Sequence, residues 1–317
     1  MDVDEYHDLP FRHAVKALIT GAGGFVGHHL VNHLDEVGDD VITTDRSIDG
    51  LDVLDAAALL DFFRKSRPEV VYHLAGASDV GGSWQTPQAT FRANAEGTLN
   101  ILWAARETDT QRVLTIGSAD VYGKVSPEDL PLTEEQPLRP VSPYAASKVA
   151  ADSVALQAWL GYSQQVVRAR PFNHLGPGQT DRFVAPAIAS RVVDNERSGG
   201  GRVLVGNLAP RRDFTDVRDV VRAYRLLVGS GRSGEVYNVC SGTATAVQDL
   251  AEKLISMASV DMKLEVDPAL ARPVDIPVLL GDNSRLRADT GWTPTIDLDT
   301  TLRDLLEDRR RIADQTE

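Results

Sequence analysis

Tyr144 and Lys148 lie four residues apart in the segment YAASK at 144–148, so on a helix their side chains share one face. A phenol with a pKa near its reference value of about 10 is a poor proton-transfer group at neutral pH. A neighbouring ammonium favours the phenolate, so we expect Lys148 to lower the pKa of Tyr144 and let it exchange a proton with a substrate oxygen. Because this spacing also arises by chance, its weight depends on the residues around it.

Ser118 ends the apolar run VLTIGS at 113–118, which is typical of a buried strand. Ligands of doubly wound sheets bind at the carboxyl ends of the strands, so the Ser118 hydroxyl is placed to hold the oxygen that Tyr144 protonates. A serine here can also simply cap the backbone. Asp120 follows two residues later and is a further candidate base. These residues predict proton chemistry beside a hydride carrier.

The segment TGAGGFVG at 20–27 follows an apolar run and opens a helical pattern. Gly21, Gly24 and Gly27 are spaced three apart, and such glycines allow a tight turn and a close approach of backbone N–H groups to a pyrophosphate. The alternative is an ordinary strand-to-helix turn. The strand, the helix and a following acidic residue favour a dinucleotide site.

That acidic residue is Asp45, at the end of the second apolar run. A carboxylate there accepts hydrogen bonds from the adenosine ribose and repels a 2′-phosphate, which favours NAD(H). Arg46 beside it would hold that phosphate instead, so NADP(H) stays possible. Asp52 and Val53 are expected to border the adenine, unless they only begin the next helix.

These residues need a scaffold that brings strand ends together. Leu30, Val31, Leu34 and Val37 recur at helical spacing between the first two apolar runs, which predicts the crossover helix of a parallel pair. The rhythm predicts an α/β fold, a Rossmann-type doubly wound parallel sheet over residues 15–171. We expect a loose tail at 1–14 and a smaller substrate-binding region over 172–317, with some segments returning to the Rossmann domain. The expected strand runs are at 15–20, 41–44, 70–75, 113–118 and 166–171.

Composition narrows the function classes. The 317 residues carry a formal net charge of −13, which disfavours a general nucleic-acid surface and leaves any anionic substrate to local arginines. Cys240 is the single cysteine, and no apolar run has membrane-spanning length. No secretory signal opens the chain, so we expect a cytoplasmic enzyme without a membrane partner. No cluster has metal-ligand spacing, so no metal is expected.

The motifs together resemble the extended short-chain dehydrogenase/reductase family. The resemblance rests on TGAGGFVG, HLAG at 73–76, Asn94 within FRANAEGTLNIL, GSADVYG at 117–123 and YAASK. The second half is similar to the GDP-sugar branch, in particular to reductases of GDP-6-deoxy-4-keto-mannose, with GDP-mannose 4,6-dehydratases as near relatives. The segments that carry this are ARPFNHLGPGQ at 169–179, VGNLAPRRDFTDVRDV at 205–220, VYNVCSG at 236–242, ARPVDIP at 271–277 and TGWTP at 290–294.

The resemblance implies a role for each matching residue. Ser118, Tyr144 and Lys148 would be catalytic. Arg212 and Arg272 would meet the substrate pyrophosphate, a role that suits guanidinium groups. The residues along the cofactor would be Gly21, Gly24, Phe25, Val26, Gly27, Asp45, Asp52, Val53, Leu74, Ala75, Gly76 and Asn94. Those near the nicotinamide or the sugar would be Phe172, Asn173, Ser78 and Trp84, of which Ser78 and Trp84 could equally be packing residues.

His73 and His174 are also considered, because His is the usual general base. His73 lies inside the apolar run 70–75, so packing is the favoured interpretation, whereas His174 beside Asn173 stays open.

Three functions compete. They are a 4-keto reductase acting on GDP-4-keto-6-deoxy-D-mannose, a GDP-mannose 4,6-dehydratase, and a silent dinucleotide sensor of the same fold. The reductase is favoured, because Ala119 after Ser118 has no proton to give and Asp120 is shorter than the Glu usual in similar dehydratases. The resemblance also implies a homodimer through the helices that bear Asn94 and Tyr144, although a tetramer stays open.

Overall fold

The computed structural model describes residues 14–270 and 276–315. The expected tail at 1–14 therefore falls almost entirely outside the described residues, and so does Arg272.

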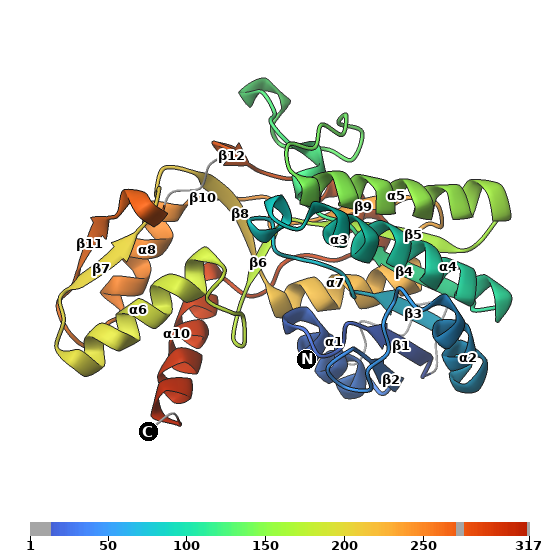
Figure 1. Cartoon of the computed structure of the whole chain (residues 1–317). Helices are drawn as coiled ribbons and strands as arrows, with labels where there is room; N and C mark the ends of the chain where they lie inside the picture. Colours follow the sequence, from blue (N-terminus) through green and yellow to red (C-terminus); the bar gives the residue numbers. More distant parts are fainter. Residues whose placement is uncertain (1–13, 271–275, 316–317) are drawn as a thin grey trace.

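A six-stranded, fully parallel sheet forms the larger lobe (Figure 1). Its spatial order is β2-β1-β3-β4-β5-β9, and every neighbouring pair is parallel. The predicted Rossmann-type fold is confirmed, and each of the five predicted runs contributes a strand. The strands are β1 (Lys16–Thr20), β2 (Asp40–Thr44), β3 (Val70–His73), β4 (Arg112–Ile116), β5 (Val166–Pro171) and β9 (Val236–Val239).

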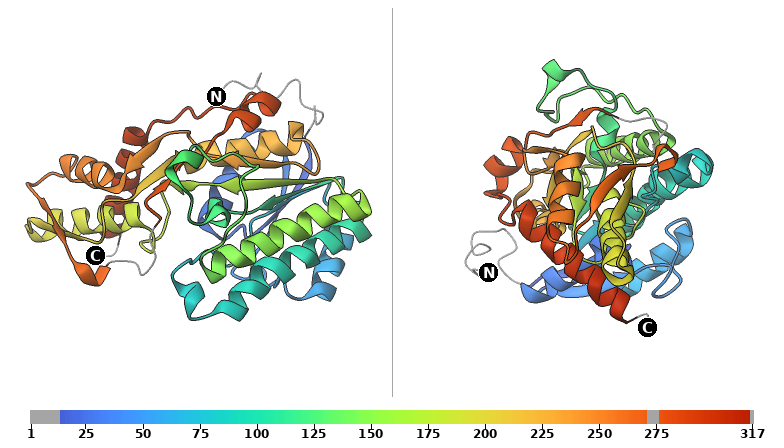
Figure 2. Two further views of the ribbon diagram at one scale, coloured as in Figure 1. Left: turned by 90° about the horizontal axis from the view of Figure 1, so that it is seen from above. Right: turned by 90° about the vertical axis from the view of Figure 1, so that its left-hand side faces the viewer.

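Helices cover both faces of this sheet. One face packs against the crossover helix α1 (Phe25–Glu36), α7 (Val217–Ser230) and α9 (Ser284–Thr290). The other packs against α2 (Ala56–Ser66), α4 (Gly97–Glu107) and the long α5 (Pro143–Tyr162), which runs along the sheet in Figure 2. The short α3 (Pro87–Phe91) and a π-helix η3 (Arg92–Glu96) lead into α4. Because the strands are apolar on both faces, they require helices on both sides.

The C-terminal lobe lies beside the carboxyl ends of the large sheet (Figure 1). Its strands β10, β8 and β12 lie in that order, β6 also pairs with β8, and β7 pairs with β11. Its own core joins apolar residues of α6, α8 and α10. The bounds are β6 (Asn173–Leu175), α6 (Val184–Ser198), β7 (Arg202–Val205), β8 (Arg211–Asp216), β10 (Ala244–Ala246), α8 (Val247–Ser256), β11 (Lys263–Val266), β12 (Val278–Leu279) and α10 (Leu298–Asp314).

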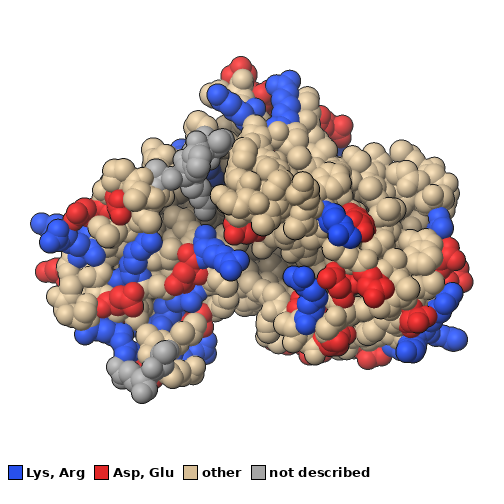
Figure 3. All heavy atoms as spheres, viewed as in Figure 1, with Lys and Arg blue, Asp and Glu red and all other residues tan. Residues whose placement is uncertain are grey.

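The chain passes between the lobes repeatedly. After β8 it returns to the large lobe as α7 and β9, crosses again for β10, α8 and β11, and returns once more as α9. The surface is hollowed where the lobes meet, and basic and acidic side chains are interspersed on the face seen in Figure 3. Within the described ranges, no helix is both long enough and apolar enough to cross a membrane.

Candidate active site

A cavity of about 1490 Å³ opens between the two lobes, at the carboxyl ends of the parallel strands. This is the position at which doubly wound sheets bind their ligands. Except for Asn94, every described residue that the sequence nominated for catalysis or binding lines it. Those residues are Gly21, Gly24, Phe25, Val26, Gly27, Asp45, Arg46, Asp52, Val53, Leu74, Ala75, Gly76, Ser78, Trp84, Ser118, Asp120, Tyr144, Lys148, Phe172, Asn173 and Arg212.

The glycine-rich turn joins β1 to α1 under steric limits that only glycine meets. Gly21 has φ of 76°, and a Cβ there would lie 2.6 Å from the amide nitrogen of Ala75. A Cβ on Gly27 would lie 2.3 Å from the carbonyl oxygen of Gly21. The first turn of α1 is thus pressed against the loop, and its N-terminus faces the cavity. These features fit the pyrophosphate of a dinucleotide.

Asp45 and Arg46 follow β2 at the far end of the cavity. Oδ1 of Asp45 accepts hydrogen bonds from the backbone N–H and the hydroxyl of Ser47, at 2.8 and 2.6 Å. Arg46 has a side chain that is 79% exposed, and its Nη1 lies 3.7 Å from Oδ2 of Asp52. The N-cap of α2 is Asp55, so Asp52 does not have the capping role considered for it. Both Asp45 and Arg46 therefore line the same end of the cavity.

Ser118, Tyr144 and Lys148 meet at the centre of the cavity. The Ser118 side chain accepts the N–H of Asp120 at 3.2 Å, so it does cap the short 3-10 helix η4 (Ala119–Tyr122). The same hydroxyl lies close enough to the Tyr144 phenol to lower the pKa of that group slightly. Lys148 Nζ lies 6.0 Å from the centre of the Tyr144 ring and donates to the carbonyl of Ile116 at 2.8 Å. The set predicted from the sequence is thus assembled.

The expectation that Lys148 lowers the pKa of Tyr144 is wrong in this structure. Burial raises the pKa of Tyr144 above its ordinary value, and the carboxylate of Asp120 raises it further. Burial also lowers the pKa of Lys148 to about 8, because a buried ammonium loses its hydration. Tyr144 is therefore protonated at neutral pH, which suits a proton donor.

Asn94 does not line the cavity, contrary to its expected place along the cofactor. It is 2% exposed and lies behind the wall, in the π-helix η3. Its Oδ1 accepts the N–H of Ala77 at 2.8 Å, and its Nδ2 donates to Ser147 Oγ at 2.8 Å. Both N–H groups of the amide are engaged in such bonds, the second to the carbonyl of Ala77, so Asn94 supports the wall.

The C-terminal lobe supplies the opposite wall. Phe172 is buried, while Asn173 is exposed and opens onto the cavity. Arg212 lies on β8, where its Nη1 donates to the carbonyl of Ile276 at 2.6 Å, so part of the guanidinium is anchored. Trp84 is 50% exposed at the rim. A large aromatic side chain left so accessible beside a cavity suits contact with a sugar face.

Further polar residues line the cavity without having been nominated, among them Arg182, Arg191 and Asn207. Arg191 lies on α6 and donates to the carbonyl of Leu204 at 2.9 Å. The segment that ends at Gln179 had pointed to this region, but Arg182 lies just past it. Arg191 and Asn207 belong to no local motif, so only the packing of α6 against β7 brings them to the site.

The two histidines differ. His73 is buried between two hydroxyls, with Nδ1 2.8 Å from Thr20 Oγ1 and Nε2 3.2 Å from Thr98 Oγ1. Burial, with the charge of Lys148, lowers the pKa of His73 to about 3, so it is a neutral packing residue as favoured. His174 lines the cavity, and its ring stacks on Phe25 with centroids 6.2 Å apart.

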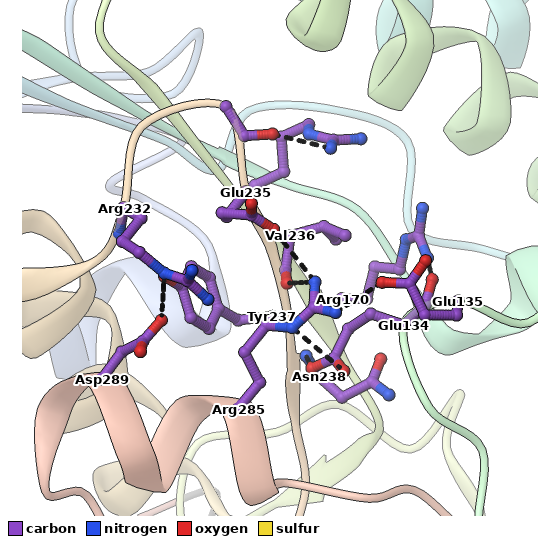
Figure 4. Close-up of polar contacts among 12 residues, drawn as sticks. Glu134, Glu135, Arg170, Arg232, Glu235, Val236, Tyr237, Asn238, Arg285 and Asp289 are labelled. Carbon is purple, nitrogen blue, oxygen red and sulfur yellow. Dashed lines mark hydrogen bonds and ion pairs between the residues drawn. The ribbon is translucent and has the colours of Figure 1, made fainter.

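A polar network that runs from the surface to the buried Glu134 and Asn238 supports the wall that carries Asp120. Arg285 of α9 reaches Glu134, Glu135 and Glu235, as Figure 4 shows. Arg170 donates to the hydroxyl of Tyr122 at 3.2 Å, and that hydroxyl donates to Asn238 at 2.6 Å. Since Tyr122 ends η4 and Arg170 precedes the wall residue Phe172, the network fixes two sides of the cavity to β9. In the part of the chain that the structure describes, no group of His, Cys, Asp or Glu is arranged to hold a metal.

Comparison with known proteins also indicates a dinucleotide-dependent enzyme. Residues 18–305 match the family model described as GDP-mannose 4,6 dehydratase. The chain belongs to this family of extended short-chain dehydrogenases/reductases. It is an enzyme that uses a nicotinamide dinucleotide.

Individual relatives narrow the comparison. The chain is 38% identical over 298 residues to a GDP-6-deoxy-D-mannose reductase of Pseudomonas aeruginosa, covering 92% of this chain and 96% of the relative. It is 29% identical to a GDP-mannose 4,6-dehydratase of Sinorhizobium fredii over 80% and 77% of the two chains. The structure of RMD from Pseudomonas aeruginosa complexed with NADPH superposes with a TM-score of 0.87, at 36% identity, over 94% of this chain and 99% of that one.

Proposed function

We propose that the enzyme reduces the C4 ketone of GDP-4-keto-6-deoxy-D-mannose to a GDP-6-deoxyhexose such as GDP-D-rhamnose, using NADH or NADPH. The observation that carries the proposal is the buried Tyr144, which lines the same cavity as Ser118 and the glycine-rich turn. The 38% identity to a protein named as GDP-6-deoxy-D-mannose reductase supports it.

In the proposed reduction, each residue of the catalytic set has a separate role. A bound reduced nicotinamide supplies the hydride that goes to C4. The Ser118 hydroxyl holds the ketone oxygen, and Tyr144 gives that oxygen its proton, so the C=O double bond becomes C–H and O–H. Lys148 lies beside this phenol, with its Nζ 6.0 Å from the centre of the Tyr144 ring and bonded to the carbonyl of Ile116. The proton is then replaced from solvent.

Substrate binding is assigned to the C-terminal wall. Arg212 and Arg272 would hold the diphosphate, with Arg272 outside the described residues. Arg182 and Arg191 add positive charge to a wall of an otherwise acidic protein. Ser78, Trp84 and Asn173 would contact the hexose.

The dehydratase is the second candidate, and Asp120 is the observation that favours it. Dehydration of GDP-mannose needs a base for the C5 proton and an acid for the leaving C6 hydroxyl, in addition to the tyrosine. Asp120 lies 3.4 Å from Ser118 Oγ and lines the cavity, so it can act as one of them. Ala119 supplies no second group, which leaves the reductase as the better supported function.

Two incubations decide between them. The protein is incubated with GDP-mannose and oxidised cofactor, and separately with the 4-keto nucleotide sugar and NADH or NADPH. We expect oxidation of the cofactor and a GDP-6-deoxyhexose only in the second incubation, with the C4 configuration identified by NMR. Formation of the 4-keto-6-deoxy product in the first, without cofactor consumption in the second, would establish the dehydratase. A bound cofactor that neither incubation consumes would indicate a sensor.

For the cofactor, we propose that NADH serves at least as well as NADPH, because Asp45 lines the cavity after β2, where its carboxylate would accept from the ribose and repel a 2′-phosphate. Arg46 is the competing group. The kcat/KM values for both cofactors are compared in the wild type and in Arg46→Ala. A tenfold or greater preference for NADPH that disappears in Arg46→Ala would show that Arg46 decides the choice.

We also propose that the protein is a homodimer through α4 and α5. Large apolar side chains remain exposed on these helices, namely Leu99, Trp103, Leu160 and Tyr162. Burial of this face in a partner copy would remove that apolar surface from water.

A further inference from the structure

Tyr144 is held at both of its peptide groups by side chains. It is the second residue of α5, whose first turn has N–H groups without partners inside the helix. Pro143 has no N–H, and the side chain of the N-cap Ser142 accepts the N–H of Ala145 at 3.1 Å. The N–H of Tyr144 is instead accepted at 3.2 Å by Ser83, which comes from a different part of the chain.

Ser83 belongs to the segment at residues 77–84 that forms one wall of the cavity. Six of its other members, including Asp79 and Trp84, line that cavity, whereas Ser83 does not line it and is 1% exposed. The Ser83 hydroxyl donates to the carbonyl of Val80 at 2.7 Å, which leaves it free to accept from Tyr144. The wall is therefore bonded directly to the backbone of Tyr144.

A second link joins the same two segments. Ser147 Oγ donates to the carbonyl of Tyr144 at 2.6 Å and accepts from Asn94 at 2.8 Å. Asn94 in turn bonds both the N–H and the carbonyl of Ala77, at 2.8 and 3.1 Å. Ser147 is fully buried and Asn94 is 2% exposed. The wall is thus tied to Tyr144 near residue 77 and at residue 83.

We propose that Ser83, Asn94 and Ser147 form a positioning clasp that fixes the Tyr144 phenol relative to the wall at residues 77–84, and so sets the rate of proton transfer. This inference rests on the proposed role of Tyr144. None of the three clasp residues is among those that line the cavity, and all three are buried. Each acts through Tyr144 and is a positioning residue, not a catalytic one.

The chemistry explains why such a clasp matters. The phenol must stay within hydrogen-bond reach of a ketone oxygen that the wall residues help to place. Misplacing a reacting group by about 1 Å can lower the rate roughly a hundredfold. Because the clasp joins the wall to Tyr144, both move together, and the distance between donor and substrate oxygen is preserved.

The test is a double-mutant cycle between Ser83→Ala and Tyr144→Phe. In the wild-type background we expect Ser83→Ala to lower kcat roughly tenfold or more, with KM and the Kd for cofactor changed less than about threefold. In the Tyr144→Phe background, Ser83→Ala should lower kcat no further, because the group that it positions is gone. Ser147→Ala should repeat this pattern, and Ser83→Thr, which restores the hydroxyl, should recover most of kcat.

The matched control is Ser256→Ala, since Ser256 Oγ also donates to the carbonyl three residues earlier, at 2.7 Å, but lies in α8 away from the cavity. It should leave kcat unchanged. Additive losses of kcat in the cycle, or losses confined to KM, would overturn the clasp. The cycle is run on whichever of the two incubations the wild type catalyses. A wrong reductase assignment therefore shows in the wild type, while a wrong clasp shows only in the variants.

Discussion

The surroundings of Tyr144 suit its proposed role as a proton donor. Burial and the Asp120 carboxylate keep the phenol protonated at neutral pH, and a reduction needs a proton donor. The spacing of Tyr144 and Lys148 predicted that they share a helix face, and they do. The direction of the Tyr144 pKa shift was not predictable from the sequence. It depends on how deeply the folded chain buries the phenol and on where the Asp120 carboxylate lies.

Replacing Tyr144 with Phe tests this role. The variant keeps the ring but loses the proton donor, so we expect kcat to fall at least about a hundredfold. The Kd for the dinucleotide, measured by fluorescence titration, should stay near the wild-type value, since the glycine-rich turn is untouched. Near-normal turnover would remove Tyr144 from the mechanism.

His73 gives a prediction on stability. Its pKa is about 3 in the folded protein and near 6.5 in an unfolded chain, so the unfolded state binds the extra proton between these values. The free energy of unfolding contributed by His73 is therefore present above pH 6.5 and is lost as the pH falls towards 3. In His73→Gln, urea unfolding at pH 6.5, 5.5 and 4.5 should show a shallower loss, by up to about 1.4 kcal/mol per pH unit. Equal slopes for the two proteins would mean that His73 accepts a proton without unfolding.

Among the elements, the βα unit at the glycine-rich turn was the most predictable. Its apolar run, glycines and helix period are all local in sequence, and β1, the turn and α1 lie where they were expected. The π-helix η3, which carries Asn94, was not predictable, because its segment reads as ordinary helix. Strand β9 was hidden as well, since its pairing with β5 depends on contacts far apart in the chain.

The Gly27 position tests how tightly this unit is built. In Gly27→Ala the new Cβ would meet two backbone carbonyls, at 2.3 and 2.6 Å, and neither can yield without moving the turn. Overpacking of this kind costs about 1–3 kcal/mol, so we expect dinucleotide affinity to weaken roughly tenfold or more. Isothermal titration of the variant with NADPH and NADH measures the effect.

Gly201→Ala is the matched control, because a Cβ there would be 3.5 Å from its nearest neighbour, an ordinary contact. Unchanged affinity in Gly27→Ala would show that α1 can shift away from the turn.

At the scale of the molecule, the exposed face of α4 and α5 predicts a dimer. Trp103→Glu would place a charge in that apolar contact, and we expect the dimer to dissociate into monomers. Light scattering after size-exclusion chromatography gives the mass of each species. Val266→Glu, at a 63% exposed position on β11, should leave the mass unchanged. A wild-type protein with the mass of one chain would refute the dimer.

Because the chain passes repeatedly between the lobes, neither lobe can be removed or exchanged as one continuous segment. A polypeptide that ended at residue 171 would lose β9, α7 and α9, which leaves the edge of β5 unpaired and one sheet face covered by α1 alone. Replacing everything after residue 171 with the C-terminal part of a related enzyme would therefore also replace β9, α7 and α9, which belong to the dinucleotide-binding sheet and its helices. We therefore expect substrate preference to change during evolution through substitutions of individual residues that line the cavity, such as Trp84 and Arg191. Exchange of the whole C-terminal lobe is not expected.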